Sequence, residues 1–230
     1  MMCAMTDSHD PILFLSGAGL SPWIWEEVRS RVSADSTVAP RPSEHSDAPL
    51  SAYTEAALAA APPGRFSIVA HSSGGVVGAE IARLVPERVT GFLGISAVIP
   101  AAGGSFLSSM PVPNRWILRA VMRLAGTRPP AKAIRRTLGT GLSDDVAERV
   151  VTEFIPESLG LYRDRTGPHT WSCHRGYLLT TQDKELSPGL QRVIAERFGA
   201  EWSDEIATGH LPMVQDPGAT AAAIDAFRIA

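Results

Sequence analysis

The pattern of apolar and polar positions along the chain predicts strands that alternate with helices. Short apolar runs bounded by turn signals predict five buried strands, at 11–16, 36–40, 66–70, 89–99 and 176–181. Each of the first three predicted strands is followed by a segment with helical spacing. The first of these segments begins at Pro22, and the other two span 51–61 and 76–85. Strands separated by helices favour an α/β fold with a doubly wound, mostly parallel sheet and helices on both faces.

Residues 101–170 break this alternation. Two stretches with helical spacing, at 116–126 and 143–154, are joined by segments rich in Gly, Pro and Arg, and no strand-like run interrupts them. We therefore expect a helical insertion over 101–170, set into a core formed by 1–100 and 171–230.

Composition narrows the class of protein. The chain has 230 residues, of which 44% are hydrophobic, and this is enough for one sizeable core. Its net charge of −3 offers no overall basic surface to nucleic acid or to an anionic membrane. The two cysteines, Cys3 and Cys173, argue against a disulfide framework, and the sequence shows neither a signal peptide nor an apolar stretch of membrane-spanning length. We expect a cytoplasmic protein without nucleic-acid or membrane partners.

The stretch FSIVAHSSGG places two serines between a predicted strand and a predicted helix. A strand, then small-x-Ser-x-small, then a helix is typical of a sharp turn that exposes a serine hydroxyl above the sheet edge. The residues two positions away must be small, because the backbone doubles back there. Ser72 is flanked in this way by Ala70 and Gly74, whereas Ser73 would place His71 at a crowded position. Ser72 is the predicted nucleophile, and an ordinary glycine-rich turn is the alternative.

A serine hydroxyl needs a nearby base to accept its proton, and histidine has a suitable pKa. His210 follows a short apolar run in IATGHLPMVQDP, on a loop where ligand sites form in a doubly wound sheet. The other histidines are His9, His45, His71, His169 and His174.

The histidine needs an acidic partner that fixes its tautomer. Asp183 lies just past the end of the fifth predicted strand, so it can point to the same sheet edge as His210. Its rivals are Glu185, Asp204 and Asp216. The chain order Ser72, Asp183, His210 matches the order Ser, Asp, His.

Two backbone donors are expected to hold a developing oxyanion. One is the N–H of Ser73, and the other is the N–H of Ala18 in LSGAGLSPW, where Gly17 lets the chain turn. All four parts of an acyl-transfer site are then present, and they imply no metal and no organic cofactor.

These motifs resemble those of the α/β-hydrolase fold family over essentially the whole chain. VAHSSGG is similar to its nucleophile elbow, TTQDKELSP to its acid loop and TGHLPMVQDP to its histidine loop. LSGAGLSPWIW resembles the oxyanion loop of the methylesterase and hydroxynitrile-lyase branch and of related bacterial esterases. The sequence departs from the family pattern at Ser16, where His is usual, and at Ala70, where Gly is usual. The resemblance implies that the insertion at 101–170 is a helical cap over the pocket, and that Gly17, His71 and Leu211 are binding residues. The lyase branch tends to have Thr in place of Gly17 and Lys in place of Leu211, so the residues of this chain favour an esterase-like site.

We therefore predict a serine hydrolase that cleaves an ester or thioester of a small-to-medium acyl substrate through an acyl-enzyme. A lyase, cyclase or C–C-cleaving enzyme on the same fold is one alternative, and a non-catalytic small-molecule receptor is another. Arg115, Arg119 and Arg123 repeat at helical spacing in a stretch, 88–143, that contains no acids. A solvated helix face explains this pattern most simply, and docking of a carrier-protein or coenzyme A thioester is the sharper hypothesis. The chain is expected to be a monomer or a homodimer.

Overall fold

The sheet is parallel throughout. The structure, a computed structural model, describes residues 10–43 and 46–230, so Cys3, His9 and His45 lie outside the described residues. Within that part of the chain, six strands pair in the order β2-β1-β3-β4-β5-β6. The strands are β1 (Ile12–Leu15), β2 (Ser36–Val38), β3 (Phe66–His71), β4 (Val89–Ile95), β5 (His174–Thr180) and β6 (Trp202–Ile206). The predicted α/β class with a doubly wound, mostly parallel sheet is confirmed.

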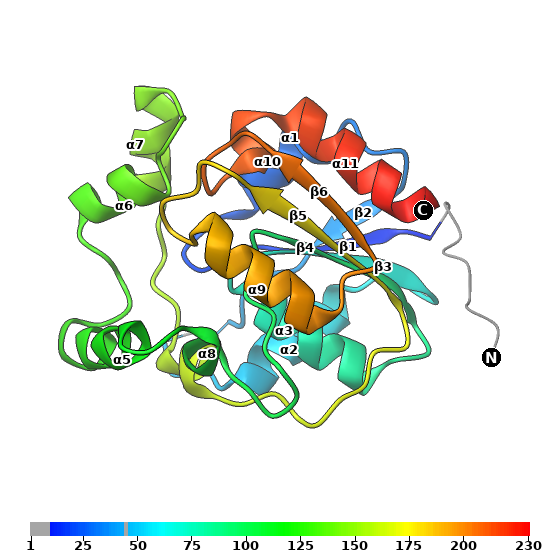
Figure 1. The fold of residues 1–230 in the computed structure, drawn as a ribbon, viewed down its shortest axis with the longest axis horizontal. Helices are drawn as coiled ribbons and strands as arrows, with labels where there is room; N and C mark the ends of the chain where they lie inside the picture. Colours follow the sequence, from blue (N-terminus) through cyan, green and yellow to red (C-terminus); the bar gives the residue numbers. More distant parts are fainter. Residues whose placement is uncertain (1–9, 44–45) are drawn as a thin grey trace.

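Helices cover both faces of this sheet (Figure 1). On one face lie α2 (Leu50–Ala60), α3 (Gly74–Leu84) and α9 (Pro188–Phe198). On the other lie the short 3-10 helix η1 (Pro22–Trp25), α1 (Glu26–Arg29), α10 (Pro212–Gln215) and α11 (Pro217–Ile229). The central strands β1, β3 and β4 are buried along their whole length, because each is packed between the two helical layers.

Most predicted elements agree with the structure to within two residues at each end, and two differ by more. The fourth strand was expected over 89–99 but ends at Ile95, because Ser96 adopts a φ of +44° that an extended strand does not allow. The segment that begins at Pro22 was expected to be one helix, and it forms η1 followed by the single turn of α1.

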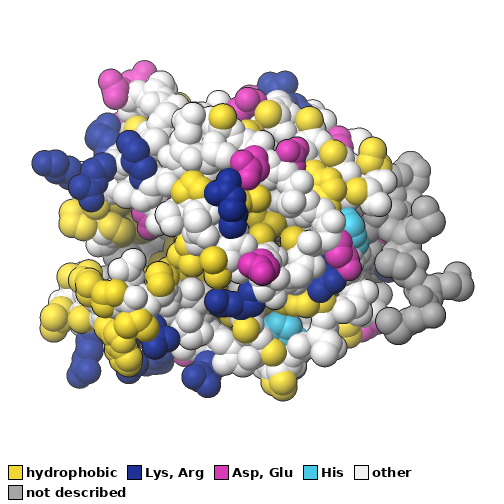
Figure 2. All heavy atoms as spheres, in the orientation of Figure 1, with side chains coloured by type: hydrophobic (Ala, Val, Ile, Leu, Met, Phe, Trp, Pro, Cys, Tyr) yellow, Lys and Arg dark blue, Asp and Glu magenta, His cyan; other side chains and the backbone are white. Residues whose placement is uncertain are grey.

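The insertion between β4 and β5 is helical. It contains α4 (Phe106–Ser109), α5 (Asn114–Ala125), α6 (Ala131–Thr137), α7 (Asp144–Thr152) and α8 (Leu159–Arg163). Helix α5 has no buried residue, and four of its large apolar side chains are exposed: Trp116, Ile117, Val121 and Leu124. Hydrophobic and basic side chains gather over α5 and α6, at the left of Figure 2. No helix in the described residues is both long and apolar enough to span a membrane.

Candidate active site

The turn between β3 and α3 singles out one of the two adjacent serines. Ser72 has a φ of +52°, a conformation that non-glycine residues rarely adopt, whereas Ser73 has a helical φ of −64°. The turn is tight enough that a Cβ atom at Gly74 would lie 2.6 Å from the carbonyl oxygen of Leu15. Ser72 therefore stands at the apex of a strained strand-to-helix turn, the geometry that lifts a side chain above the sheet edge.

His210 and Asp183 meet at the same edge of the sheet. The His210 Nδ1 lies 2.7 Å from the Asp183 Oδ2, and both side chains are buried. Asp183 follows the end of β5, and His210 follows the end of β6, so the carboxyl ends of two adjacent strands bring them together. The carboxylate can only accept, so Nδ1 carries the hydrogen and Nε2 is left as the proton acceptor of the neutral ring.

The Asp183 carboxylate is held by donors from several directions. Its Oδ1 accepts from the backbone N–H groups of Glu185 and Leu186, at 2.7 and 2.9 Å. Its Oδ2 also accepts from the hydroxyl of Thr180, at 2.9 Å, and from the amide nitrogen of Gln191, at 3.2 Å. These bonds fix the orientation of the carboxylate, so that its Oδ2 faces the His210 Nδ1.

Ser96 is a member of this site that the sequence did not reveal. Its hydroxyl donates to the Asp183 Oδ2 at 2.5 Å and lies 3.2 Å from the His210 Nδ1. The loop after β4 supplies no acid, as expected from the sequence, but it supplies this donor. Because Ser96 has a positive φ, its backbone turns out of the strand just where the hydroxyl reaches Asp183.

The electrostatics of the pair follow from burial and mutual attraction. Burial by itself would raise the pKa of Asp183, but the facing His210 and the donated hydrogen bonds hold that pKa well below its usual range. Burial would lower the pKa of His210, but the Asp183 carboxylate overcomes this and raises it. Asp183 is therefore ionised, and it stabilises the protonated form that His210 reaches after accepting a proton.

His71 supports His210 through the main chain rather than through its charge. Its Nε2 lies 2.8 Å from the carbonyl oxygen of His210, so Nε2 carries the hydrogen and donates it. Burial, together with the nearby His210, lowers the pKa of His71 to about 3, and its ring is neutral at physiological pH. His71 is a fully buried support for the loop that carries His210.

The turn, the two histidines and the loop after β1 are in close contact. The rings of His71 and His210 have centroids 4.7 Å apart, and Ser72 directly follows His71. A Cβ atom at Gly17 would lie 2.8 Å from the His71 Nδ1 and from the Ser72 Cβ, so only glycine fits there. In the described part of the chain, no hydrogen bond joins the Ser72 hydroxyl to His210. Such bonds are often long without substrate and shorten in the reacting complex.

The loop at residues 16–20, called the glycine loop below, is clamped by the insertion. Glu157 accepts a hydrogen bond from the backbone N–H of Gly19 at 3.1 Å, and the Ile155 N–H donates to the Gly19 carbonyl at 3.1 Å. The ring of Phe154 fills the space beside Gly19, whose φ is +79°. The position of Ala18, the predicted oxyanion donor, is therefore set partly by the insertion.

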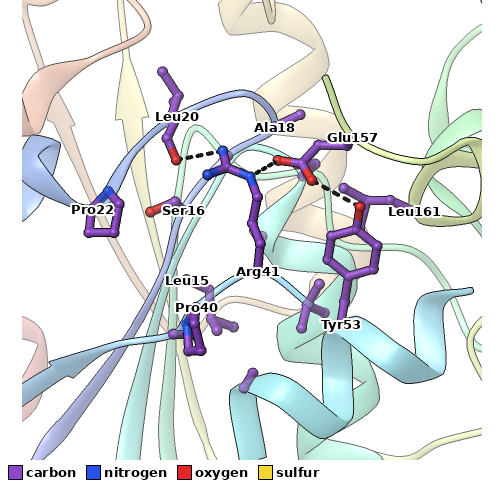
Figure 3. A pocket seen from close by; sticks show the side chains of 16 residues that line it. Leu15, Ser16, Ala18, Leu20, Pro22, Pro40, Arg41, Tyr53, Glu157 and Leu161 are labelled. Atoms are coloured by element: carbon purple, nitrogen blue, oxygen red, sulfur yellow. Dashed lines mark hydrogen bonds and ion pairs between the residues drawn. The ribbon is translucent and has the colours of Figure 1, made fainter. Parts of the chain in front are cut away.

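A cavity of about 60 Å³ lies against the glycine loop and the start of α3 (Figure 3). Its wall includes Gly17 and Ala18 of the loop, and Ser73 and Gly74, which directly follow Ser72 in the turn. Ser72, Asp183 and His210 do not line it.

A buried ion pair forms one end of the cavity. The Nε of Arg41 donates to the Glu157 Oε1 at 2.6 Å, and the Tyr53 hydroxyl donates to the Glu157 Oε2 at 2.9 Å. The Nη2 of Arg41 donates to the Leu20 carbonyl at 2.8 Å. Nothing in the sequence pattern indicated that these three side chains would meet, because they come from the loop after β2, from α2 and from the insertion.

The remaining candidates have other partners. Asp204 accepts from the Glu205 backbone on β6, Asp216 caps α11, His169 contacts the Gly167 carbonyl, and His174 pairs with Glu201. Leu211 is fully buried in the apolar cluster beneath α10 and α11 and does not line the cavity. Among the described residues, no group of His, Cys, Asp and Glu could hold a metal ion.

Comparison with known proteins gives one family and many similar structures. The model of the Alpha/beta hydrolase family matches residues 12–223. No curated protein matches the chain. An extracellular alpha/beta-hydrolase from a Paenibacillus species, described as sharing structural and functional homology with tobacco salicylic acid binding protein 2, is 16% identical with a TM-score of 0.81. That alignment covers 94% of this chain and 97% of the other.

Two further solved structures are esterases or hydrolases by name. Polyneuridine aldehyde esterase is 16% identical with a TM-score of 0.75, over 95% of this chain and 99% of that one. A pyrethroid hydrolase from Sphingobium faniae is 19% identical with a TM-score of 0.74, over 96% and 98% of the two chains. At these identities the likeness is one of fold.

Proposed function

The chain belongs to the alpha/beta hydrolase family, and from this premise we propose that it is a serine hydrolase that cleaves an ester or thioester through an acyl-enzyme. Ser72 is the nucleophile, His210 the general base and acid, and Asp183 the group that orients His210. The observation that carries the proposal is the buried contact of 2.7 Å between the His210 Nδ1 and the Asp183 Oδ2, next to a strained turn with Ser72 at its apex.

The reaction proceeds in two halves. The Ser72 Oγ attacks the acyl carbon while the His210 Nε2 accepts its proton, and the backbone N–H groups of Ala18 and Ser73 stabilise the oxyanion. His210 then returns the proton to the departing alkoxide or thiolate. In the second half a water molecule loses a proton to His210 and attacks the acyl-enzyme, and Ser72 leaves with that proton.

The test is covalent labelling with a fluorophosphonate, followed by mass spectrometry of the labelled peptide. The wild-type protein should be labelled on Ser72, the Ser72→Ala variant should not react, and the matched Ser172→Ala variant, which alters an exposed serine, should react as the wild type does. Label on Ser73 in the wild type would contradict the assignment. Turnover of a candidate substrate by Ser72→Ala would favour a lyase or cyclase, and a wild type that neither reacts nor turns over esters would favour a receptor.

We also propose that part of the substrate range is thioesters with a phosphate-bearing handle. A cleft of about 330 Å³ on the insertion is lined by Arg115, Arg119, Arg163 and Arg165. In the described residues, the guanidinium groups of Arg115, Arg119 and Arg165 form no ion pair, so this surface keeps its positive potential. Helix α8 contributes to both hollows. Its Leu161 lines the cavity beside the glycine loop, and its Arg163 lines the arginine-rich cleft.

Two thioesters with the same acyl group test this part of the proposal. Butanoyl-coenzyme A carries phosphates, and S-butanoyl-N-acetylcysteamine does not. The Arg119→Glu variant should lower kcat/KM for the coenzyme A thioester about tenfold at low salt and leave the truncated thioester unchanged. The matched control is Arg136→Glu, the same charge reversal on α6 outside the cleft. Equal losses on both thioesters would contradict a phosphate-binding role.

A further inference from the structure

Two polar side chains in the wall of the cavity have unused hydrogen-bonding capacity. Ser73 is buried, with 1% of its surface exposed, and its hydroxyl has no hydrogen-bond partner in the described residues. The guanidinium of Arg41 uses Nε and Nη2 for Glu157 and Leu20 but makes no hydrogen bond through Nη1 in that same part of the chain. In Figure 3 this third nitrogen points away from Glu157, toward the side where Ser16 and Pro22 lie.

A buried polar atom without a partner, such as the Ser73 hydroxyl, is unfavourable unless water or a ligand satisfies it. That cost falls on the Ser73 hydroxyl, whereas the Arg41 Nη1 is not fully buried. Arg41 itself makes two hydrogen bonds, to Glu157 and to the Leu20 carbonyl, and Glu157 is in turn fixed by Tyr53 and by Gly19. Only 19% of the Arg41 side chain and 4% of the Glu157 side chain are exposed. The guanidinium is therefore preorganised rather than free to turn toward solvent.

We propose that Arg41 and Ser73 form a polar subsite that determines which esters this site accepts. This inference rests on the proposed function and names the substrate class: esters in which an ether, hydroxyl or keto oxygen lies a few atoms from the scissile carbonyl. Arg41 donates to that oxygen through Nη1, and the Ser73 hydroxyl donates to it or accepts from it. The cavity has room for only a few non-hydrogen atoms, so the oxygen-bearing group is short.

The charge state of the wall favours an uncharged group over a carboxylate. Glu157 already balances the charge of Arg41, so a second carboxylate would lie buried near Glu157 without a cation of its own. A cationic group would lie against the guanidinium and be repelled. A neutral oxygen acceptor gains a bond from a charged donor without adding a buried charge.

Two pairs of isosteric esters test the subsite. 4-Nitrophenyl methoxyacetate and 4-nitrophenyl butanoate differ by one oxygen in place of a methylene in the acyl part. 2-Methoxyethyl acetate and butyl acetate differ in the same way in the alcohol part. The measured quantity is the preference, the ratio of kcat/KM within each pair. The intrinsic reactivity of each ester is the same for every variant, so it cancels when preferences are compared between variants.

The variants remove the donor while keeping the protein folded. Arg41→Lys retains a charge to pair with Glu157 but loses Nη1, and the double variant Arg41→Met with Glu157→Leu leaves no unpaired charge. Both should lower the preference for the methoxy ester about tenfold in at least one pair. The matched control is Arg192→Met, which breaks an exposed ion pair with Glu205 and should leave both preferences unchanged. Preferences that stay within about twofold of the wild type in both pairs would overturn the proposal.

A binding measurement separates this proposal from the proposed function. NMR titration of the Ser72→Ala protein, which cannot be acylated, should show tighter binding of the methoxyacetate ester than of the butanoate ester, and the added Arg41→Met and Glu157→Leu changes should abolish the difference. Equal affinities in the Ser72→Ala protein would refute the subsite whether or not Ser72 is a nucleophile. A wild type that is not labelled at Ser72 would refute hydrolysis, while the titration would still decide the role of Arg41.

Discussion

The Nε2 of His71 donates a hydrogen bond to the main-chain carbonyl of His210 across 2.8 Å. The residue before the predicted nucleophile therefore holds the residue predicted to be its base. Because the two histidines lie 139 positions apart in the chain, this contact ties the turn after β3 to the loop after β6. It fixes the backbone of His210, while Asp183 fixes its ring.

Replacing His71 by Phe should therefore weaken both stability and activity. The ring volume is largely retained, but the buried His210 carbonyl loses its donor, at a cost of about 1–3 kcal/mol in the free energy of unfolding. The loosened His210 should lower kcat/KM about tenfold or more, since small displacements of a catalytic group are costly. Urea unfolding and ester hydrolysis measure the two effects. His169→Phe is the control, because that ring contacts the Gly167 carbonyl away from the site; equal activity of the two variants would contradict the support role of His71.

The pH dependence of kcat/KM should show an acid limb set by His210. His210 accepts the Ser72 proton only when it is neutral, and its pKa is raised above the ordinary value of 6.5. The rate should therefore rise with pH through a midpoint above about 6.5 and fall away below it. His71 cannot produce this limb, because its pKa is lowered to about 3.

The Asp183→Asn variant tests the cause of that midpoint. Without the carboxylate, burial alone acts on His210 and lowers its pKa, so the acid limb should move to lower pH while kcat falls steeply. The control is Asp204→Asn, an exposed carboxylate on β6. If the acid limb of the wild-type enzyme had its midpoint at or below the pKa of free histidine, Asp183 would not set the pKa of His210.

Removing the hydroxyl of Ser96 should destabilise the folded protein. A hydrogen bond to an ionised carboxylate contributes about 1.5–3 kcal/mol, so Ser96→Ala should lower the free energy of unfolding by about that amount at pH 7. Because the pKa of Asp183 is depressed in the folded state, this stabilisation is present above the ordinary carboxyl pKa and is lost as the pH falls through the depressed value. Urea titrations of Ser96→Ala and of Ser172→Ala, an exposed serine, give the comparison. Equal stabilities would mean that the bond to Asp183 contributes nothing.

Much of this architecture could be predicted because the signals are local. Each apolar run, such as that of β1 or β3, and each helix break, such as Pro62 to Gly64, spans only a few neighbouring residues, and the α/β alternation follows from them. The turn at Ser72 was predictable for the same reason, because the close approach of the Leu15 backbone leaves no room for a side chain at Gly74.

The parts that were missed depend on distant or atypical contacts. β6 is exposed at three of its five positions, so the only apolar signal near it is the short run that begins at Ile206, and the extent of the strand could not be predicted. Ser96 is one of several serines until the folded chain brings it to Asp183, 87 positions away. Glu157, Arg41 and Tyr53 meet only because the insertion folds back on the core. Side-chain contacts of this kind leave no periodic pattern in one sequence.

Gly17 provides a test of the close packing around Ser72. A Cβ atom there would lie 2.8 Å from the His71 Nδ1 and from the Ser72 Cβ, and Gly17 does not have a positive φ, so Gly17→Ala acts through space rather than backbone strain. The methyl group should push the glycine loop away from Ser72, lowering the free energy of unfolding by about 1–3 kcal/mol. It should slow fluorophosphonate labelling about tenfold or more, because an oxyanion donor moves with the loop.

Gly189→Ala is the matched control for this prediction. Its Cβ would meet no atom within 4 Å at the start of α9, so stability and labelling should be unchanged or stability slightly raised. If Gly17→Ala lost stability but kept the wild-type labelling rate, the glycine loop would not supply the oxyanion donor. The N–H of Ser73 would then have to stabilise the oxyanion without Ala18. Loss of labelling with nearly full stability would instead place the effect at the Ser72 hydroxyl and the glycine loop beside it.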